Sequence, residues 1–178
     1  MKTEEQLGFP KKSELLHTAE AIDSAISRIA RAINYSPISK TTPLVICVLN
    51  GGLLFTGHLL PRLSFPLELG YIHTSKYSGS SEVLTDFQVK SDFPDVEERT
   101  VLFLDDVLDS GETLKFLEEH ATICGATQVK TAVLVHKTDS AWRSHFIGLP
   151  APNKFLFGFG MDYRGLWRNL PAIYAIKE

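Results

Sequence analysis

The sequence lacks the residues and segments that mark several specialised classes of protein. Its 178 residues include only two cysteines, Cys47 and Cys124, without the paired spacing of a disulfide framework or a zinc site, so both are predicted to be reduced, buried thiols. The six histidines show no metal-ligand spacing either. No apolar run is long enough to span a bilayer, and the N-terminal residues contain no apolar core of a secretory signal. A cytoplasmic protein is therefore expected.

Neither sign of charge is in large excess. The net charge is -3 at pH 7 and no long run of Lys or Arg occurs, so neither a nucleic acid nor a membrane is expected as a partner. With 44% hydrophobic and 22% charged residues, the composition is that of an ordinary globular protein. The length predicts a single domain over residues 1–178.

Hydrophobic spacing predicts alternating helices and strands. Apolar residues recur at intervals of four and three between Ser13 and Asn34, which indicates an amphipathic helix with Ser13 as its N-cap. Strands are predicted over residues 44–49, 67–73, 100–104 and 128–136, and further helices over 53–60 and 112–124. Residues 75–99 are polar and irregular, which is typical of a functional loop with one or two short strands. The alternation predicts an α/β fold with a doubly wound, mostly parallel sheet flanked by helices.

The most informative stretch is VLFLDDVLDSGETL, residues 101–114. Four apolar residues run into Asp105 and Asp106, Asp109 follows, and Ser-Gly-Glu-Thr then opens the predicted helix. Ligands of open α/β sheets bind beyond the C-terminal ends of the strands, so the paired acids are expected to be exposed. The start of a helix offers free backbone N–H groups to an anion, and Gly111 permits close approach of the backbone.

A sugar phosphate would suit both halves of this stretch. Its phosphate would lie on residues 110–113, and its hydroxyl groups would donate to the acids, which could instead hold a divalent cation. The alternative is a helix capped by Asp109 that follows two solvated aspartates. A G-x-x-x-x-G-K-[ST] loop is absent, GFGMDYRG does not fit G-x-G-x-x-G, and the spacing of Asp106 and Asp109 does not suit an aspartyl-phosphate phosphatase.

The stretch resembles the phosphoribosyl pyrophosphate motif of type I phosphoribosyltransferases. From about residue 44 to 171 the chain is similar, more narrowly, to the hypoxanthine-guanine phosphoribosyltransferases. Four blocks follow the order of that family: VLNGGLLF, SKYSGSSE, the acid-rich stretch, and VHKTDS with KFLFGFGMDYRGLWRNLP.

The resemblance implies where the phosphoribosyl donor binds. Pyrophosphate would contact the backbone of Leu49, Asn50 and Gly51, around a cis peptide at Leu49–Asn50, although the family usually has lysine in place of Asn50. Arg168 is similar to an arginine that contacts pyrophosphate, a role suited to a planar guanidinium. The ribose hydroxyls and Mg²⁺ would meet Asp105 and Asp106. The 5′-phosphate would be held by Ser110, Gly111, Glu112 and Thr113, although many relatives have Lys, Arg or Asn in place of Glu112.

The resemblance also implies where the purine binds. Asp109 would be the catalytic acid or base at purine N7. Lys137 resembles a lysine that donates to the 6-oxo group, Phe155 an aromatic that stacks on the ring, and Leu156 a residue whose backbone reads the purine edge. Asp162 is similar to an acid that helps to place a second Mg²⁺.

Two larger features follow from the same resemblance. Ser75 and Tyr77 resemble residues of a mobile loop that closes over the site, although Lys76 separates them here. The domain would comprise a core over about 13–140 and a small hood over about 141–178, with a contribution from the N-terminus.

The implied reaction is purine salvage. The 5-phosphoribosyl group would move from phosphoribosyl pyrophosphate to N9 of hypoxanthine or guanine, with Mg²⁺ as cofactor and IMP or GMP and pyrophosphate as products. A homodimer or homotetramer is expected. Three alternatives stay open: a xanthine-preferring enzyme, a regulator on the same fold that senses phosphoribosyl pyrophosphate and binds RNA, and a binding domain without activity.

Overall fold

The structure is a computed structural model that describes residues 8–76, 87–89 and 93–177. The expected loop residue Tyr77 lies outside the described residues, as does the side chain of Ser75. The strands and helices in the first half are β1 (Ser13–His17), α1 (Ala19–Asn34), η1 (Pro37–Lys40), β2 (Leu44–Leu49), α2 (Gly52–Leu59), η2 (Leu60–Arg62), β3 (Glu68–Lys76) and β4 (Phe87–Val89). The second half contains β5 (Thr100–Leu108), α3 (Glu112–Ile123), β6 (Gln128–Lys137), β7 (Phe146–Ala151), β8 (Leu156–Phe157) and β9 (Ile173–Ile176).

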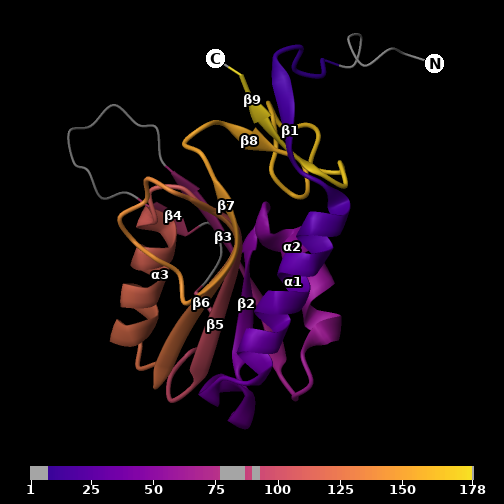
Figure 1. Ribbon diagram of the computed structural model, residues 1–178. Helices are drawn as coiled ribbons and strands as arrows, with labels where there is room; N and C mark the ends of the chain where they lie inside the picture. Colours follow the sequence, from indigo (N-terminus) through magenta and orange to yellow (C-terminus); the bar gives the residue numbers. More distant parts are fainter. Residues whose placement is uncertain (1–7, 77–86, 90–92, 178) are drawn as a thin grey trace.

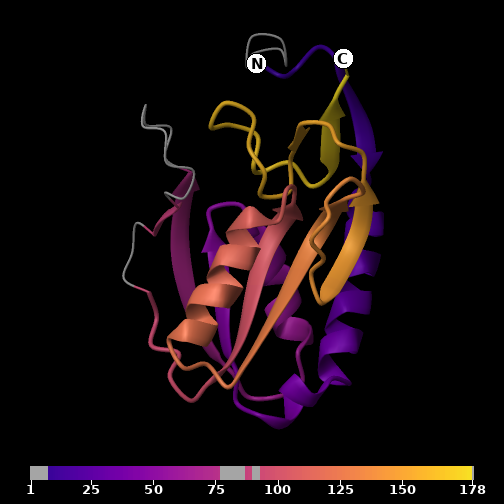
Figure 2. The same ribbon diagram turned by 90° about the vertical axis from the view of Figure 1, so that its left-hand side faces the viewer.

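The strands form two sheets. The larger has the order β4-β3-β2-β5-β6-β7, in which β4 alone pairs antiparallel, and the smaller is antiparallel with the order β1-β9-β8. Helices α1 and α2 cover one face of the large sheet and α3 covers the other (Figure 1). The parallel strands of the large sheet point toward the small sheet (Figure 2). The predicted α/β fold with a mostly parallel sheet is therefore confirmed, and the small sheet lies over the edge where ligands of such folds bind.

Helix α1 shows both the value and the error of the hydrophobic pattern. Its predicted stripe is buried at Ile22, Ile26, Ile29 and Ile33, and Ala25 and Ala30 are buried beside it. Ala19, which the same spacing also placed in the stripe, is exposed. The helix begins after Thr18, whose Oγ1 accepts a hydrogen bond from the Ala21 N–H at 3.3 Å. The predicted start at Ser13 is wrong, because Ser13–His17 forms β1 and pairs with β9 from the other end of the chain. Leu15 matched the helical spacing by chance and is 54% exposed.

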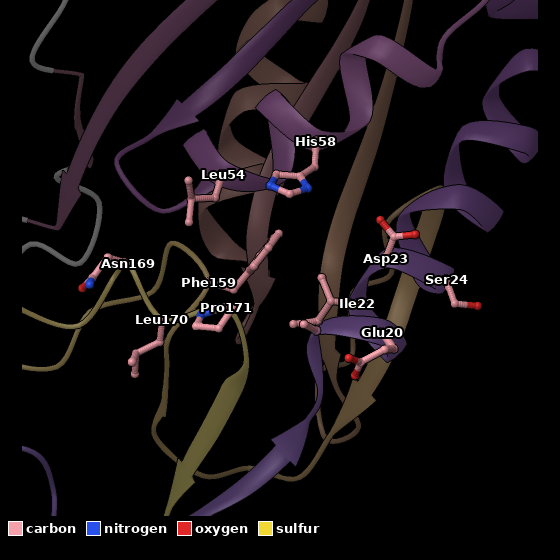
Figure 3. Close-up of a pocket in the computed structure, with 11 residues that line it drawn as sticks. Glu20, Ile22, Asp23, Ser24, Leu54, His58, Phe159, Asn169, Leu170 and Pro171 are labelled. Atoms are coloured by element: carbon pink, nitrogen blue, oxygen red, sulfur yellow. The ribbon is translucent and has the colours of Figure 1, made fainter.

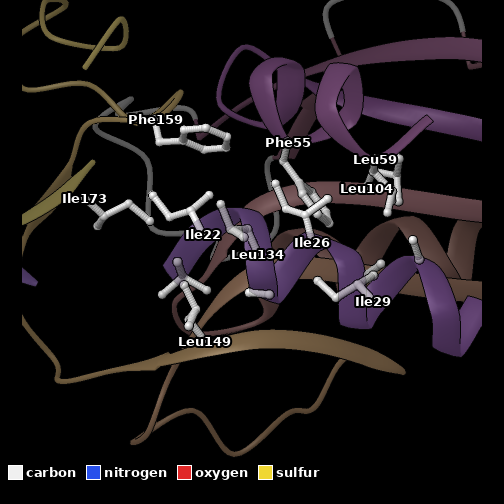
Figure 4. Close-up of a cluster of buried hydrophobic side chains, with 14 of the residues drawn as sticks. Ile22, Ile26, Ile29, Phe55, Leu59, Leu104, Leu134, Leu149, Phe159 and Ile173 are labelled. Atoms are coloured by element: carbon white, nitrogen blue, oxygen red, sulfur yellow. The ribbon is translucent and has the colours of Figure 1, made fainter. Parts of the chain in front are cut away.

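Two apolar cores lie on the two faces of the large sheet. The core beneath α3 includes Phe103, Leu108, Leu114 and Leu117. The core beneath α1 and α2 extends to Phe159 and Ile173 of the region around the small sheet (Figure 4). This continuous burial fixes the small sheet against the large one, since close-packed interiors resist sliding.

The strands near the two ends of the chain belong to different sheets. β1 belongs to the small sheet and β7 to the large one. The division into a core and a hood near residue 141 stays a prediction, with β7 on the side of the large sheet.

The two cysteines differ in exposure. Cys47 is buried in β2 as predicted, and burial raises the pKa of its thiol. Cys124 follows the last residue of α3 and is exposed, so the prediction that both thiols are buried is wrong for this residue.

Candidate active site

Asp105 and Asp106 lie inside β5 rather than beyond it. The strand continues to Leu108 because its pairing with β6 continues, Asp105 opposite Val133 and Leu108 opposite His136. The two acids are only 9% and 8% exposed. The expected exposure is therefore wrong, because the strand is longer than its run of apolar residues indicates.

Burial has a strong electrostatic effect on this pair. It raises the pKa of Asp105 well above its usual range, and the neighbouring charge of Asp106 raises it further. Burial also raises the pKa of Asp106, an effect that hydrogen bonds to this carboxyl and the positive charge of Arg168 partly offset. The backbone N–H of Val107 donates to Asp106 Oδ1 at 2.7 Å. The pair would gain stability from a cation or from ligand hydroxyls that donate to it.

The turn after β5 is built around Gly111. This residue has φ of +85°, in the left-handed region that favours glycine, and α3 begins at Glu112 as predicted. The N-cap of α3 is Gly111, which has no side chain to cap the helix, and the Glu112 N–H donates a long hydrogen bond of 3.5 Å to the Ser110 hydroxyl. Asp109 is therefore not the N-cap that the alternative interpretation required. The positive end of the α3 dipole and the N–H groups of its first turn favour an anion at this point.

A second glycine turn lies beside the acids. The Leu49–Asn50 peptide is cis, as expected from the family resemblance. A methyl group on Gly51 would overlap the Asp106 carboxylate, and one on Gly52 would lie 2.8 Å from the Leu104 carbonyl oxygen. Glycine is thus required here because the turn approaches β5 so closely, and this approach places its backbone next to the acidic pair.

Lys137 is the last residue of β6 and lies between the acidic pair and the residues expected to bind the purine. Its Nζ donates to Asp109 Oδ2 at 2.9 Å, and the lysine side chain is 11% exposed whereas that of Asp109 is 65% exposed. The buried cation therefore holds an otherwise solvated carboxylate at the mouth of the site.

The remaining residues come from the loops around the small sheet. Arg168 donates to Asp162 Oδ1 and to the Gly160 carbonyl oxygen, both at 2.6 Å, and the Gly165 N–H donates to Asp162 Oδ2 at 2.8 Å. Phe155 is 54% exposed and meets the Tyr163 ring edge-on at 5.9 Å between centroids. These contacts orient a cation and an aromatic ring toward the edge of the large sheet.

One pocket of about 290 Å³ collects most of the predicted residues. It is lined by Leu49, Gly51, Asp105, Asp106, Asp109, Thr113, Lys137, Phe155, Leu156, Asp162 and Arg168. Asn50, Ser110, Gly111 and Glu112 lie in the adjoining turns but do not line it. Sequence reasoning missed four lining residues, Val48, Thr74, Val107 and Met161. Thr74 had a usable signal, since it is a polar residue near the end of the strand beside β2.

A larger pocket of about 650 Å³ lies elsewhere, between α1, α2 and residues 159–171 (Figure 3). Its walls include Leu54, Phe159 and the imidazole of His58, which meets Phe159 edge-on at 5.1 Å. Of the two acids that line it, Glu20 and Asp23, Asp23 already pairs with Arg62. Size alone therefore does not identify the active site; the chemistry lies in the smaller pocket.

The acids of the pocket do not form a complete metal site by themselves. Among the described residues, no group of three or more His, Cys, Asp or Glu side chains is arranged to hold a metal ion. Asp162 pairs with Arg168 instead of joining Asp105 and Asp106. Two adjacent carboxylates in one pocket nevertheless fit Mg²⁺, which binds few protein oxygens and takes the remainder from water and phosphate.

The phosphoribosyl transferase domain model matches residues 13–164, which include both glycine turns and the acidic pair. The chain belongs to this family. It is 31% identical to the hypoxanthine-guanine phosphoribosyltransferase of Streptococcus thermophilus strain CNRZ 1066, over 93% of each chain. It is 30% identical to the enzyme of the same name from Bacillus subtilis strain 168, over 92% of this chain and 93% of that one.

A solved structure shares the fold of this phosphoribosyl transferase domain. The crystal structure of a hypoxanthine phosphoribosyltransferase from Staphylococcus aureus matches with a TM-score of 0.84 at 26% identity, over 92% of this chain and 91% of that one. Within the described residues, no helix is both long and apolar enough to cross a bilayer.

Proposed function

We propose that this protein is a purine-salvage enzyme that transfers the 5-phosphoribosyl group from phosphoribosyl pyrophosphate to N9 of hypoxanthine or guanine. The products are IMP or GMP and pyrophosphate. The observation that carries the proposal is one pocket that joins a buried acidic pair, the start of α3 and a lysine-aspartate pair. The relatives, named as hypoxanthine-guanine phosphoribosyltransferases, support the same assignment.

The donor would lie along the edge of the large sheet. Its 5′-phosphate would accept hydrogen bonds from the backbone N–H groups of residues 110–113, at the start of α3. Its ribose hydroxyls would donate to Asp105 and Asp106, which satisfies buried carboxylates without adding negative charge to them. Pyrophosphate would lie on the backbone of the turn at Leu49, Asn50 and Gly51, with the Arg168 guanidinium beside it.

The purine would enter between Lys137 and Asp109. A 6-oxopurine presents its O6 and N7 atoms side by side on one edge. Lys137 Nζ would donate to O6, and the Asp109 carboxylate would handle the proton on N7. The 2.9 Å contact between these two side chains shows that they reach the same place, so the purine edge would take over the contacts that they now make with each other.

One face of the purine ring would meet the side of the pocket that lies next to the small sheet. Phe155 would stack on the ring, which its exposure permits. The backbone of Leu156 would read the ring edge, and Asp162 would orient Arg168 and water near the pyrophosphate.

Mg²⁺ would be held by Asp105 and Asp106 together with donor oxygens, and when bound it would neutralise the charge that grows on the departing pyrophosphate. Ser75 and Tyr77 are proposed to belong to a loop that excludes water from the reacting sugar.

The proposed assembly is a homodimer or homotetramer without nucleic acid. Light scattering after gel filtration would measure the mass of the particle. A gel shift with RNA, run beside the turnover assay, would test the alternative of an RNA-binding regulator.

The decisive experiment is IMP formation from hypoxanthine, phosphoribosyl pyrophosphate and Mg²⁺, followed by chromatography. Guanine and xanthine in parallel reactions measure the base preference, and omission of Mg²⁺ with added chelator tests the cofactor. We expect IMP and GMP, with little turnover in chelator. An absence of nucleotide with all three bases would overturn the proposal.

A further inference from the structure

A tryptophan outside the predicted site lies against the turn at Gly111, where the 5′-phosphate is proposed to bind (the phosphate turn). A Cβ atom added to Gly111 would lie 2.8 Å from Trp142 Cβ, 3.3 Å from its Cγ and 3.4 Å from its Cε3. The tryptophan therefore lies directly against the Gly111 backbone. It does not line the pocket that holds the acids and Lys137.

Trp142 is itself held in place by packing on a core and by a hydrogen bond within its own loop. Its side chain packs on the core beneath α3, which contains Leu108 before the turn and Leu114 after it. The Trp142 carbonyl oxygen accepts a hydrogen bond from the Ser140 hydroxyl at 3.1 Å. The Ser140 N–H donates to the Lys137 carbonyl oxygen, also at 3.1 Å. A single short loop thus connects the residue proposed to bind O6 with the tryptophan behind the phosphate turn.

The turn needs such support. Glycine has the largest backbone freedom of any residue, and Gly111 must hold φ of +85° so that α3 can start at Glu112. Gly111 is the N-cap and has no side chain to fix the start of the helix, where the Ser110 hydroxyl accepts a long hydrogen bond of 3.5 Å from the Glu112 N–H. A turn that sampled other conformations would have to be ordered each time a phosphate binds, which weakens binding.

We propose that Trp142 is a positioning residue that holds the Gly111 turn in its phosphate-binding conformation. The inference rests on the proposed function, because it concerns the site of the 5′-phosphate. Trp142 acts through the turn and need not touch the substrate. Its loss should therefore affect the donor and leave binding of the free base little changed.

Steady-state kinetics of Trp142→Ala would test this separation. We expect the KM for phosphoribosyl pyrophosphate to rise about tenfold, the change that ordering one or two backbone residues produces. The KM for hypoxanthine and kcat should stay within about twofold. Trp142→Phe, which keeps an aromatic ring against Gly111, should restore most of the donor affinity. Ile123→Ala is the matched control, since it removes an apolar side chain of α3 that is 82% exposed.

Fluorescence supplies a second readout that leaves Trp142 itself unchanged. The chain has two tryptophans, so Trp167→Phe leaves Trp142 as the only one. IMP should change the emission of Trp142, whereas inosine, which lacks the phosphate, should not. An emission change that is equal for the two ligands, or absent while calorimetry detects IMP binding, would overturn the role of Trp142.

The outcomes separate this inference from the function beneath it. A wild-type protein that forms no nucleotide overturns the proposed function and the role of Trp142 with it. A wild-type protein that forms IMP, beside a Trp142→Ala variant with unchanged donor KM or with equal losses for both substrates, overturns the role of Trp142 alone.

Discussion

The two ends of the active-site pocket are built by different means. At the large-sheet end, the groups that would hold the donor are backbone atoms and buried acids: Gly51 has no room for a methyl group beside Asp106, and both paired acids are less than a tenth exposed. At the small-sheet end, half-exposed side chains such as Phe155 are oriented by their neighbours. Lys137 and Asp109 lie between the two ends.

This difference indicates what each end tolerates. A backbone contact is indifferent to the side chain it carries but fails when a Cβ atom blocks the approach. A side-chain contact is lost when that side chain is replaced, but it tolerates a Cβ atom added to the backbone nearby. Asn50 and Glu112 depart from the pattern expected from the family resemblance. They lie at the turns where backbone atoms would make the ligand contacts, so the comparison predicts that the identity of their side chains matters least.

The largest effect is expected where the two ends meet. Asp109→Ala should lower kcat by about 10²–10⁴-fold, because general acid–base assistance at N7 is lost. The KM values should change little, since the carboxylate is 65% exposed and is not part of a core. Initial rates with both substrates varied would measure this. Turnover within a few-fold of the parent would show that Asp109 is not the catalytic residue.

The backbone-built end can be broken with a single methyl group. Gly51→Ala should lower kcat/KM for phosphoribosyl pyrophosphate by about 10²-fold, because the overlap with Asp106 displaces the turn. Gly57→Ala in α2 is the matched control, since a Cβ atom there meets nothing within 4 Å. Equal kinetics of the two variants would contradict the requirement for glycine at position 51.

The purine contact of Lys137 should give the next effect. Lys137→Ala removes a hydrogen bond from a charged donor, so the KM for hypoxanthine should rise about 10- to 100-fold. The KM for phosphoribosyl pyrophosphate should change little, which is the reverse of the result expected for Trp142→Ala. An unchanged hypoxanthine KM would count against this role and against the division of the pocket into two ends.

Burial of the acidic pair predicts a smaller effect on stability. Because the folded protein raises the pKa of Asp105, the folded state binds the proton more tightly than the unfolded state. The stability from this group is present below the ordinary carboxyl pKa and is lost as the pH rises through the raised value. Asp105→Asn, which stays neutral, should therefore raise the Tm at pH 7 by about 2–4 °C while reducing activity.

The pH dependence provides the control for that variant. The gain in Tm should shrink as the pH falls toward 4 in ligand-free protein without Mg²⁺, because wild-type Asp105 is then protonated as well. Thermal melts of both proteins across this range would measure it. A variant that is less stable than wild type at pH 7 would contradict the proposed cost of the buried charge.

The smallest effect is expected at Glu112. If only its backbone N–H meets the phosphate, Glu112→Gln should change the KM for phosphoribosyl pyrophosphate by no more than about threefold at moderate salt. The comparison would be sharpened by repeating the assay at high salt, where the difference should vanish. A loss as large as that of Gly51→Ala would show that the Glu112 side chain takes part in binding.

Several elements could be predicted because their signals are local. Strand β2 is a short apolar run followed by glycines, and α3 begins at Glu112 after a glycine with positive φ. The errors occurred where distant segments decide. Ser13 was predicted to cap a helix, whereas it pairs with Ile176. The acids after the apolar run were predicted to be exposed, whereas pairing with β6 continues past them.

The amino-acid sequence by itself determined the acid-rich turn, the glycines beside it and the alternation of strands and helices. Each of these depends on residues that are close to one another in the sequence. Only the tertiary structure decided that Asp105 and Asp106 are buried, that Lys137 pairs with Asp109, and that Trp142 supports Gly111. These contacts join segments that no local pattern connects, and the burial of one polar group depends on every element packed around it.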